Sequence, residues 1–486
     1  MVDSFSFTNV SEKSDDTNST LYRDRCSITI ILLSTYRYAC QESGAYHIHG
    51  VRMHNIRLVY YDEPERTEFC DKKSSFDFTF NIMGKDNISR FDHCYGCGVC
   101  VAVCPVKIIS FKENEMGFYS PCIENQEKCI NCGLCLKICA FNHEEVSNDS
   151  EKDSRAYAAH SNNEIVRQRC SSGGIGFEIG KIMIEQGYKA CGVRYNPELR
   201  RAEHFIAETL EEFQPSVGSK YIPSFSAEAF SRINKKEKNF VTGTPCQIDS
   251  FRRMIRHFKV EDNFVLMDFF CHGVPSLLLW NKYLSEVESR IGQSTFISWR
   301  NKTTGWHDSW AMCADADADS LDWHNSYNLN IREKKSLYQS RMTEGDLFYK
   351  IFLGNYCLNE CCYKDCKYKL CHSAADIRIG DLWGKTYAGE NKGTSAVLSF
   401  TSKGTEIIEE LSSTSCSFEQ ILPSVATEGQ MARPANSPWV KSFIFNSLKS
   451  KISLESIADR WCRIYQLSII PKRAFNKFKR IIRNKS

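Results

Sequence analysis

Residues 94–105 read CYGCGVCVAVCP, and residues 129–140 repeat the same cysteine spacing as CINCGLCLKICA. Both stretches have the C-x2-C-x2-C-x3-C spacing with which cysteines bind 4Fe-4S clusters. Each cluster has four iron corners, and each corner takes one soft thiolate ligand. The repeat therefore predicts two 4Fe-4S clusters and a role in electron transfer.

The order of the cysteines within each motif predicts which thiols share a cluster. In paired motifs of this kind, the first three cysteines bind one cluster and the fourth binds the cluster of the other motif. Gly98 and Gly133 would let the backbone approach the clusters closely. Ala140 stands where a proline would be expected, which removes no ligand. The first cluster then takes Cys94, Cys97, Cys100 and Cys139, and the second takes Cys104, Cys129, Cys132 and Cys135.

A zinc site and a chance repeat are the two alternatives to iron. Zinc sites usually combine separate C-x2-C pairs rather than two full C-x2-C-x2-C-x3-C runs. A chance recurrence of this pattern is negligible in a chain with 24 cysteines among 486 residues. The repeat therefore favours iron–sulfur clusters.

The composition excludes several classes of protein. Hydrophobic residues make up 42% and charged residues 25%, as in ordinary globular domains, and the formal net charge of +3 gives no reason to expect a nucleic-acid binder. The polar N-terminus lacks the regions of a signal peptide, and no apolar run reaches the roughly 18–20 residues that cross a bilayer. We therefore expect a cytoplasmic protein. In that reducing compartment, clustered cysteines usually indicate metal or redox chemistry.

The chain divides into six parts by its changes in composition. Residues 1–82 begin with a stretch rich in Ser, Asn, Asp and Thr, which predicts a poorly ordered extension. This extension is either a genuine arm or lies upstream of a natural start at Met83. After it we expect a ferredoxin domain over 83–142, a linker over 143–154, two α/β domains over 155–240 and 241–400, and a helical region with a basic tail over 401–486.

The predicted fold class is α+β, with a ferredoxin-like module followed by a mixed α/β body and a helical C-terminal region. Short apolar runs that are typical of buried strands alternate with helical stretches after residue 155. We expect strands at 156–159, 190–195, 239–242 and 264–270, and a helix at 175–186.

Small-residue turns follow strands or precede helices in this body. SSGG at 171–174 precedes a helix, GTPCQ at 243–247 opens one after a strand, and CHG at 271–273 follows a strand. Backbone N–H groups at a helix start can bind phosphate, although an ordinary helix cap is the alternative. Because ligands of α/β folds collect at one edge of the sheet, these turns predict a shared site.

The motif order extends further along the chain. After the ferredoxin repeat come SSGG (171–174), GSKY (218–221), GTPCQ (243–247), CHG (271–273), WRNK (299–302), Gly305-Trp306 and ADIRIGDLWG (375–384). Over about residues 85–400 the chain resembles the beta-subunit family of coenzyme F(420) hydrogenases and dehydrogenases. The resemblance implies an iron–sulfur flavoprotein, in which FAD exchanges single electrons with the clusters and a hydride with the deazaflavin coenzyme F(420).

The chemistry supports a flavin independently of the resemblance. Iron–sulfur clusters carry single electrons whereas hydride carriers take two, and a flavin can exchange both. We expect the glycines and Thr244 to hold phosphate, and Lys220 to neutralise it or to lie near the flavin ring. The predicted flavin-binding residues are Ser172, Gly173, Gly174, Lys220, Thr244, Gln247 and His272.

A third group of cysteines lies just before ADIRIGDLWG. It comprises Cys357, Cys361, Cys362, Cys366 and Cys371, and its spacing differs from that of the repeat. A third cluster, a zinc ion or reduced free thiols would each explain this group.

The tail at 471–486 is basic and carries apolar residues at helical spacing. It would lie on an anionic membrane surface or pack on the body, and we favour the body. Trp299, Trp306 and Trp310 are expected in the core or in pocket walls.

The sequence therefore predicts an oxidoreductase that passes electrons between two clusters and a flavin, and then to F(420) or another hydride acceptor. One alternative is a non-catalytic ferredoxin-type electron-transfer subunit. The other is a reductase in polysaccharide or cofactor biosynthesis. The expected partner is a redox protein or a small-molecule hydride carrier, and not a nucleic acid.

Overall fold

A computed structural model describes residues 86–147, 154–317 and 335–470, together with four short strands in the unit Met1–Ile82. In that unit β1 (Phe5–Ser6) pairs with β2 (Ser27–Ile28), and β3 (Tyr46–Ile48) pairs with β4 (Val51–Met53). The rest of the N-terminal extension and the basic tail at 471–486 lie outside the described residues, as do the predictions made for them. The second unit, Met83–Ser486, contains the ferredoxin module and the body.

The ferredoxin module contains two short helices and one hairpin. Helix α1 (Val99–Val103) includes the third cysteine of the first motif, Cys100, and α2 (Leu134–Lys137) includes the third cysteine of the second, Cys135. Gly98 and Gly133 precede these helices with φ angles of 76° and 66°, a left-handed conformation that favours glycine. Strands β5 (Ile109–Glu113) and β6 (Tyr119–Ile123) pair antiparallel between the two motifs.

A mixed sheet forms the centre of the body. Among the described residues its order is β10-β9-β8-β11-β12-β16-β17-β7-β18. The four central strands β8, β11, β12 and β16 are parallel, whereas β16, β17, β7 and β18 alternate in direction. The strands are β7 (Arg155–Ser161), β8 (Lys189–Asn196), β9 (Arg201–Ala207), β10 (Ser224–Phe225), β11 (Asn239–Thr242), β12 (Phe264–Phe269), β16 (Ile377–Asp381), β17 (Ser395–Ser399) and β18 (Cys416–Ile421).

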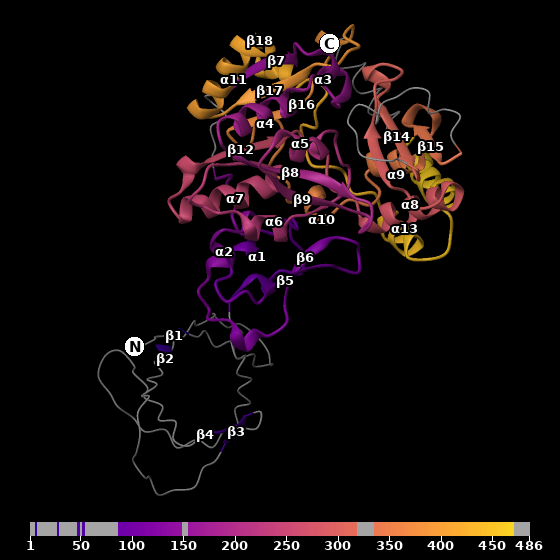
Figure 1. Ribbon diagram of the computed structural model, residues 1–486. Coiled ribbons are helices and arrows are strands. Elements are labelled where there is room, and N and C mark those ends of the chain that lie inside the picture. Colours follow the sequence, from indigo (N-terminus) through magenta and orange to yellow (C-terminus); the bar gives the residue numbers. More distant parts are fainter. Residues whose placement is uncertain are drawn as a thin grey trace, which may run out of the picture. The chain divides into compact units, whose positions relative to one another are not determined.

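Helices cover both faces of this sheet (Figure 1). One face packs against α4 (Ile175–Glu185) and α11 (Ser402–Thr414). The other packs against α6 (Ala227–Arg232) and α7 (Pro245–His257), whose apolar side chains share a core with Val99 and Ile138 of the ferredoxin module. The module therefore packs on the sheet through α6 and α7. Shorter helices of the body are α3 (Glu164–Arg169), α5 (Leu210–Phe213), α10 (Glu360–Tyr363) and α12 (Pro423–Ala426).

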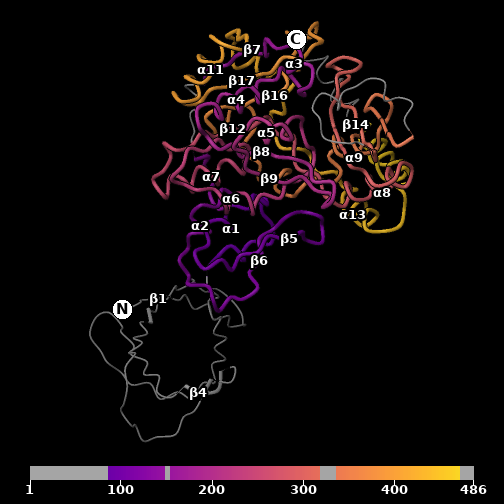
Figure 2. The backbone as a smooth tube through the Cα atoms, in the orientation of Figure 1, coloured from indigo at the N-terminus to yellow at the C-terminus, as the bar shows by residue number. Residues whose placement is uncertain are grey.

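A second layer lies beside the large sheet. Strands β13 (Phe296–Arg300), β14 (Trp310–Asp315) and β15 (Leu337–Arg341) form an antiparallel sheet. Its core includes Trp280 and Trp299 and side chains from the C-terminal helices. In Figure 2 the backbone of β14 runs beside the helices of this layer. The helices are α8 (Leu277–Ile291), α9 (Leu347–Leu353), α13 (Lys441–Leu448) and α14 (Leu454–Ile457), followed by a π-helical turn (Ala458–Cys462).

The predicted fold class is confirmed, and the expected strands and helix form close to the expected positions. Two features differ from the expected divisions. The boundary expected at 240/241 falls inside β11, because strands from both sides of it pair in one sheet. The C-terminal region also contributes β18, whose backbone pairs with β7. Within the described residues, no helix has the length and apolar character to span a membrane.

Candidate functional site

The first cysteine motif is buried against the body. Cys97 and Cys100 are buried, and the Cys97 carbonyl accepts a hydrogen bond from Ser226 Oγ at 2.8 Å. A Cβ added to Gly98 would lie 2.3 Å from the same Ser226 oxygen, so the turn fits only as glycine. Asn359 Nδ2 donates to the Cys94 carbonyl at 3.2 Å. The motif is therefore positioned by distant parts of the chain.

Ser250 on α7 joins the two ends of the first cluster site. Its Oγ lies 3.4 Å from Cys97 Sγ and accepts the Ala140 N–H at 3.0 Å. Burial raises the pKa of Cys94 and of Cys139 to about 12. Thiols in such surroundings ionise readily only when a bound metal compensates their charge, which suits iron ligands.

The second motif faces outward. Cys132 is exposed, and its neighbour Ile130 is 59% exposed. A Cβ added to Gly133 would meet no atom within 4 Å. Cys129 Sγ accepts a hydrogen bond from Asn87 Nδ2 at 3.6 Å, inside the ferredoxin module itself. The two motifs thus have equal spacing but different surroundings.

The thiol arrangement fits cubic clusters better than single ions. One small cavity is lined by all four cysteines assigned to the first cluster, Cys94, Cys97, Cys100 and Cys139. In the second set, burial and next the nearby thiols of Cys132 and Cys129 raise the pKa of Cys135. Among the described residues, the one group whose ligand atoms all lie within 4.8 Å is His93, Cys361 and Asp365. Cluster ligands bind separate iron corners and need not converge on one point, whereas ligands of a single zinc ion must.

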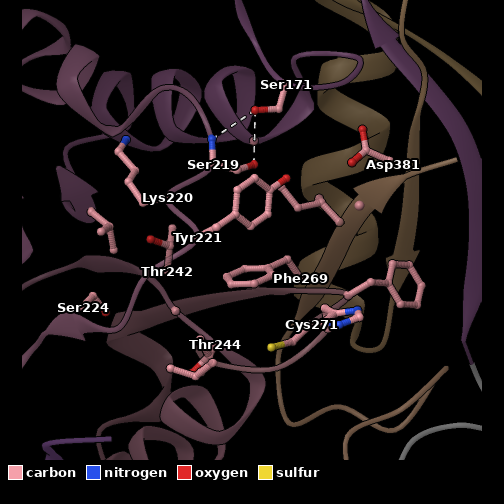
Figure 3. A pocket seen from close by; sticks show the side chains of 18 of the residues that line it. Ser171, Ser219, Lys220, Tyr221, Ser224, Thr242, Thr244, Phe269, Cys271 and Asp381 are labelled. Carbon is pink, nitrogen blue, oxygen red and sulfur yellow. Dashed lines mark hydrogen bonds between the residues drawn. The ribbon is translucent and has the colours of Figure 1, made fainter. Parts of the chain in front are cut away.

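A cavity of about 470 Å³ opens at the carboxyl ends of the parallel strands. Thr242 ends β11, Phe269 ends β12 and Asp381 ends β16, and all three line this cavity. Ligands of α/β sheets collect at this edge, so the cavity is a candidate binding site. Figure 3 shows Tyr221, Phe269 and Cys271 around the same space, with Ser171 and Ser219 hydrogen-bonded beside it. Tyr95 and Gly96, which lie between the predicted cluster ligands Cys94 and Cys97, also line it.

Arg300 from WRNK organises one wall of this cavity. Its guanidinium is 1% exposed and donates to Asp381 Oδ2 and to the Tyr221 hydroxyl, each at 3.0 Å. It also donates to the Ser171 carbonyl at 3.0 Å, so it joins SSGG, GSKY and IGDLWG. The same guanidinium lies over the Trp383 ring, with its Cζ 5.3 Å from the centre of that ring. These sequence motifs are therefore parts of one buried polar network.

Six of the seven predicted flavin residues line the cavity: Ser172, Gly174, Lys220, Thr244, Gln247 and His272. Gly173 lies behind the wall, because its N–H donates to Ser395 Oγ and its carbonyl accepts from Ser161. Thr244 N and Oγ1 both donate to Gln247 Oε1, at 2.9 and 3.0 Å. These two side chains cap α7.

Lys220 and His272 have buried polar groups. Lys220 Nζ donates to the carbonyls of Pro215 and Val217, at 2.9 and 3.0 Å, and burial lowers its pKa to about 7. In Figure 3 its amine points away from Tyr221 and Phe269. His272 Nε2 lies 2.7 Å from Asn355 Oδ1, and burial lowers the pKa of this imidazole. Both polar groups already have protein partners.

The third group of cysteines is divided by the fold. Cys357 and Cys371 lie in separate apolar clusters, so neither belongs to a common site with the other. Cys362 and Cys366 instead lie near Cys271 of CHG and Cys246 of GTPCQ. Burial, and next the charge of the neighbouring Cys271, raise the pKa of Cys362 to about 12. Burial also raises the pKa of Cys271 to about 11; the Lys369 cation opposes this shift and the nearby Cys366 adds to it. Residues 357–371 thus contain only half of this thiol group.

Sequence reasoning missed several residues of the cavity. Arg300, Tyr221 and Asp381 belong to motifs that marked the family, but the sequence did not show that they meet. Cys246 and Cys271 lay inside turns that were interpreted as phosphate sites. The cysteine inside each of these turns, considered together with Cys362 and Cys366, was the signal that could have indicated a shared thiol group. Trp299 and Trp306 are core residues and Trp310 lines the cavity, as expected.

Comparisons with known proteins agree with the two parts of the fold. Residues 236–421 match the family of the C-terminal part of the coenzyme F420 hydrogenase/dehydrogenase beta subunit, and residues 93–143 match the 4Fe-4S dicluster domain. No curated protein matches. Among solved structures, the chain is similar to one in the F420-reducing NiFe hydrogenase complex from Methanosarcina barkeri, with 16% identity and a TM-score of 0.38, over 56% of this chain and 87% of that chain.

The family matches and the sequence motifs support the same relationship. The dicluster match covers all eight predicted ligands, and the C-terminal match covers GTPCQ, CHG, WRNK and IGDLWG. The two matches support the resemblance to the coenzyme F420 hydrogenase/dehydrogenase beta-subunit family and an N-terminal 4Fe-4S dicluster domain, so the chain is related to iron–sulfur oxidoreductases that transfer electrons.

Proposed function

We propose that this chain is an iron–sulfur flavoprotein that passes electrons between two 4Fe-4S clusters and FAD, and then to coenzyme F420 or another hydride acceptor. One observation supports this most strongly. A single cavity is bordered both by the small-residue turns and by Tyr95 and Gly96, which lie between ligands of the first cluster. A cofactor in that cavity would therefore lie next to the first cluster.

The cavity suits a flavin in size and lining. Its volume of about 470 Å³ falls within the range of roughly 300–1,000 Å³ that is usual for cofactor sites. Its walls combine aromatic rings, such as Tyr221 and Trp310, with the backbone of small-residue turns. When bound, a flavin would supply the exchange between single electrons and a hydride. This chain would supply position and exclusion of water.

The residues around the cavity have distinct expected roles. The N-terminus of α4, preceded by Ser172 and Gly174, points backbone N–H groups toward anionic groups of the cofactor. Arg300 acts as a positioning residue, because it holds Ser171, Tyr221 and Asp381 in place without lining the cavity itself. Asp381 remains available to the cavity as a hydrogen-bond acceptor.

A third 4Fe-4S site at Cys246, Cys271, Cys362 and Cys366 is part of this proposal. Cys271 borders the cavity, and Cys246 is an electrostatic neighbour of Cys271, Cys362 and the first-cluster ligand Cys97. Four thiols from three segments match the needs of one cube. A cube held by these thiols would be close both to the cavity, through Cys271, and to the first cluster, through Cys246.

We also propose a reducing cytoplasmic location, in which the chain exchanges electrons with a redox protein. The 21 cysteines that the structure describes are all free thiols. In an oxidising compartment, thiols clustered in this way would form disulfides.

Anaerobic purification with reconstitution tests the proposal. We expect about twelve irons per chain, four for each cube, and one extractable FAD. Ser219→Phe should fill the cavity and lower the FAD content at least about fivefold while iron is unchanged. Cys271→Ser should remove about four irons and leave the ferredoxin clusters.

The control and the contrary results are equally direct. Ser412→Phe on the exposed side of α11 adds the same ring outside the cavity and should leave FAD bound. Absence of flavin in a chain with intact clusters would favour a ferredoxin-type electron-transfer subunit. About eight irons per chain would refute the third site but not the flavoprotein.

A further inference from the structure

Three metal-binding side chains converge where the ferredoxin module meets the body. His93 directly precedes the predicted cluster ligand Cys94, Cys361 is on α10, and Asp365 follows that helix. The ligand atoms of His93, Cys361 and Asp365 all lie within 4.8 Å of one another. Neither the eight predicted cluster ligands nor the proposed third cluster site includes any of these three residues. The group is therefore a separate candidate site.

Local structure places the two body residues on the same side of one helical turn. The Asp365 N–H donates to the Cys361 carbonyl at 3.1 Å, so the turn that begins in α10 extends to Asp365. Side chains four residues apart in such a turn are neighbours on one face. The Asp365 carbonyl accepts the Tyr95 hydroxyl at 2.5 Å, which holds this turn beside the first cysteine motif. His93 Nε2 then lies 3.6 Å from Asp365 Oδ2.

The three donors suit a zinc ion. Zinc binds thiolate at about 2.3 Å and imidazole or carboxylate at about 2.0–2.2 Å, usually with four ligands in a tetrahedron. A nitrogen and an oxygen ligand of such an ion lie roughly 3.4 Å apart, close to the 3.6 Å between His93 Nε2 and Asp365 Oδ2. Thiolate and imidazole donors also favour zinc over magnesium and calcium, which prefer oxygen.

The surroundings make the site accessible and leave its carboxylate available. The side chains of His93 and Asp365 are 50% and 41% exposed, whereas Cys361 is buried. An ion can therefore enter from solvent and reach the thiol. Among the described residues, no lysine or arginine forms an ion pair with Asp365, and the adjacent Lys364 pairs with Glu360 at 2.8 Å.

Cys361 is distinct from the thiols assigned to clusters. It is close enough to Cys94 to interact with it electrostatically, but it does not line the small cavity that the four cysteines of the first cluster share. Cys362 is the next residue of α10, and its Sγ accepts the Val274 N–H at 3.4 Å. Successive residues of a helix point about 100° apart, so these two thiols have different surroundings.

We propose that one zinc ion binds His93, Cys361 and Asp365, with water as the fourth ligand, and links the ferredoxin module to the body. On binding, the Cys361 thiol releases its proton to solvent and its sulfur bonds to zinc, and no electron is transferred. The inference goes beyond the proposed function, because it requires neither the flavin nor the third cluster.

Zinc binding to the full chain, reconstituted with its iron–sulfur clusters under anaerobic conditions, tests the proposal. After addition of zinc chloride and desalting, elemental analysis should find about one zinc per chain and unchanged iron. X-ray absorption at the zinc edge should show a single sulfur neighbour at about 2.3 Å and nitrogen or oxygen neighbours at about 2.0–2.2 Å. Asp365→Asn and Cys361→Ser should each weaken zinc affinity at least about tenfold, because loss of an outer-shell partner alone costs about 10–100-fold. Competition with a zinc-binding dye measures this affinity.

Matched controls separate loss of a ligand from damage to the fold. Asp262→Asn and Cys313→Ser remove an exposed carboxylate and a buried thiol outside the group, and both should keep the native zinc affinity. Zinc should raise the denaturant midpoint of the native chain and of these controls but not of Asp365→Asn, because an ion that binds only the folded chain stabilises it.

Four results would overturn the proposal. The first is a chain that retains no zinc, and the second is equal zinc affinity in Asp365→Asn and Asp262→Asn. The third is zinc bound by sulfur alone, which would place it at a cluster site. The fourth is loss of about four irons from Cys361→Ser, which would make Cys361 a cluster ligand.

Discussion

The two cysteine motifs have the same spacing, a glycine at the same place before the third ligand, and opposite surroundings. Gly98 in the first motif packs against Ser226, which precedes α6, whereas Gly133 in the second faces open space. Cys97 is buried and Cys132 is exposed. A repeat in sequence therefore gives two ligand loops of similar shape, and the body decides how each is used. The buried loop borders the cavity through Tyr95 and Gly96, and the exposed loop is open to solvent at Cys132.

The largest expected difference between the motifs is in the rate of cluster loss. In air with a chelator, we expect the second cluster to lose iron at least about tenfold faster than the first, because thiol oxidation follows exposure. Iron release should be biphasic, with about half of the ferredoxin iron in the fast phase. Alkylation followed by mass spectrometry should label Cys129 and Cys132 before Cys97. A single phase, or earlier labelling of Cys97, would contradict the assigned difference.

A matched pair of glycine variants tests the packing difference directly. Gly98→Ala combines left-handed strain with a contact of 2.3 Å to Ser226 Oγ, and should cost about 2–4 kcal/mol of unfolding free energy. Gly133→Ala carries the strain alone and should cost about 1–2 kcal/mol. Denaturant unfolding of both variants measures the difference.

Removing the contacting oxygen provides the control for this pair. Ser226→Ala in the Gly98→Ala background should recover part of the lost stability, although it also removes the hydrogen bond to the Cys97 carbonyl. Equal costs for the two glycine variants would show that the first motif is not packed as described.

Acid should destabilise the body beneath the first motif. His204 packs 4.8 Å from the ring of Phe230 on α6, and burial lowers its pKa to about 4. Among the described residues its Nδ1 has no hydrogen-bond partner, whereas Nε2 lies 3.1 Å from the Thr242 carbonyl. The unfolded chain, with an ordinary histidine pKa near 6.5, binds the extra proton first, so stability falls as the pH falls from about 6.5 to 4. The loss should reach about 2 kcal/mol at pH 5.

Unfolding free energies at pH 7 and pH 5 check this sign. His204→Gln cannot titrate and should lose less stability than the native chain over the same interval, by about the same 2 kcal/mol. His257→Gln, on the last turn of α7, is the control. An identical pH dependence in the native chain and the His204 variant would exclude this group as the cause.

The smallest expected effects are shifts in reduction potential. Ser250→Ala removes the hydroxyl beside Cys97, and Asn87→Ala removes the amide that donates to Cys129. Loss of one hydrogen bond of about 0.5–1.5 kcal/mol corresponds to roughly 20–60 mV for a one-electron couple. Each variant should lower the potential of its own cluster, since fewer donors stabilise the reduced state. EPR-monitored titration that shows both clusters shifting together would contradict the separate environments.

The ferredoxin module and most elements of the body could be predicted from the sequence. The cysteine spacing predicted eight ligands because cluster chemistry limits which thiols can share a cube, and the dicluster match covers all eight. The strands at 239–242 and 264–270 were visible because buried parallel strands are continuous apolar runs. The sequence did not show that position 240/241, expected as a domain boundary, lies inside a strand. Pairing within one sheet joins segments whose local compositions differ.

The candidate site was less predictable. Six of the seven expected flavin residues reach the cavity, yet Lys220 points its amine to backbone carbonyls and Gly173 lies behind the wall. Arg300 and Asp381 are 81 residues apart, and Cys246 and Cys362 come from different elements. A single sequence contains no local signal for such pairs.

By itself, the sequence determined the α+β class and predicted the eight cluster ligands, because apolar periodicity and ligand spacing act over a few residues. Only the tertiary structure decided which motif is buried, which cysteines join Cys362 and Cys366, and which turns share the cavity. Those outcomes depend on contacts between segments far apart in the chain. Such contacts form because parallel strands bring their carboxyl ends to one edge and because α6 and α7 offer an apolar face to only one of two similar loops.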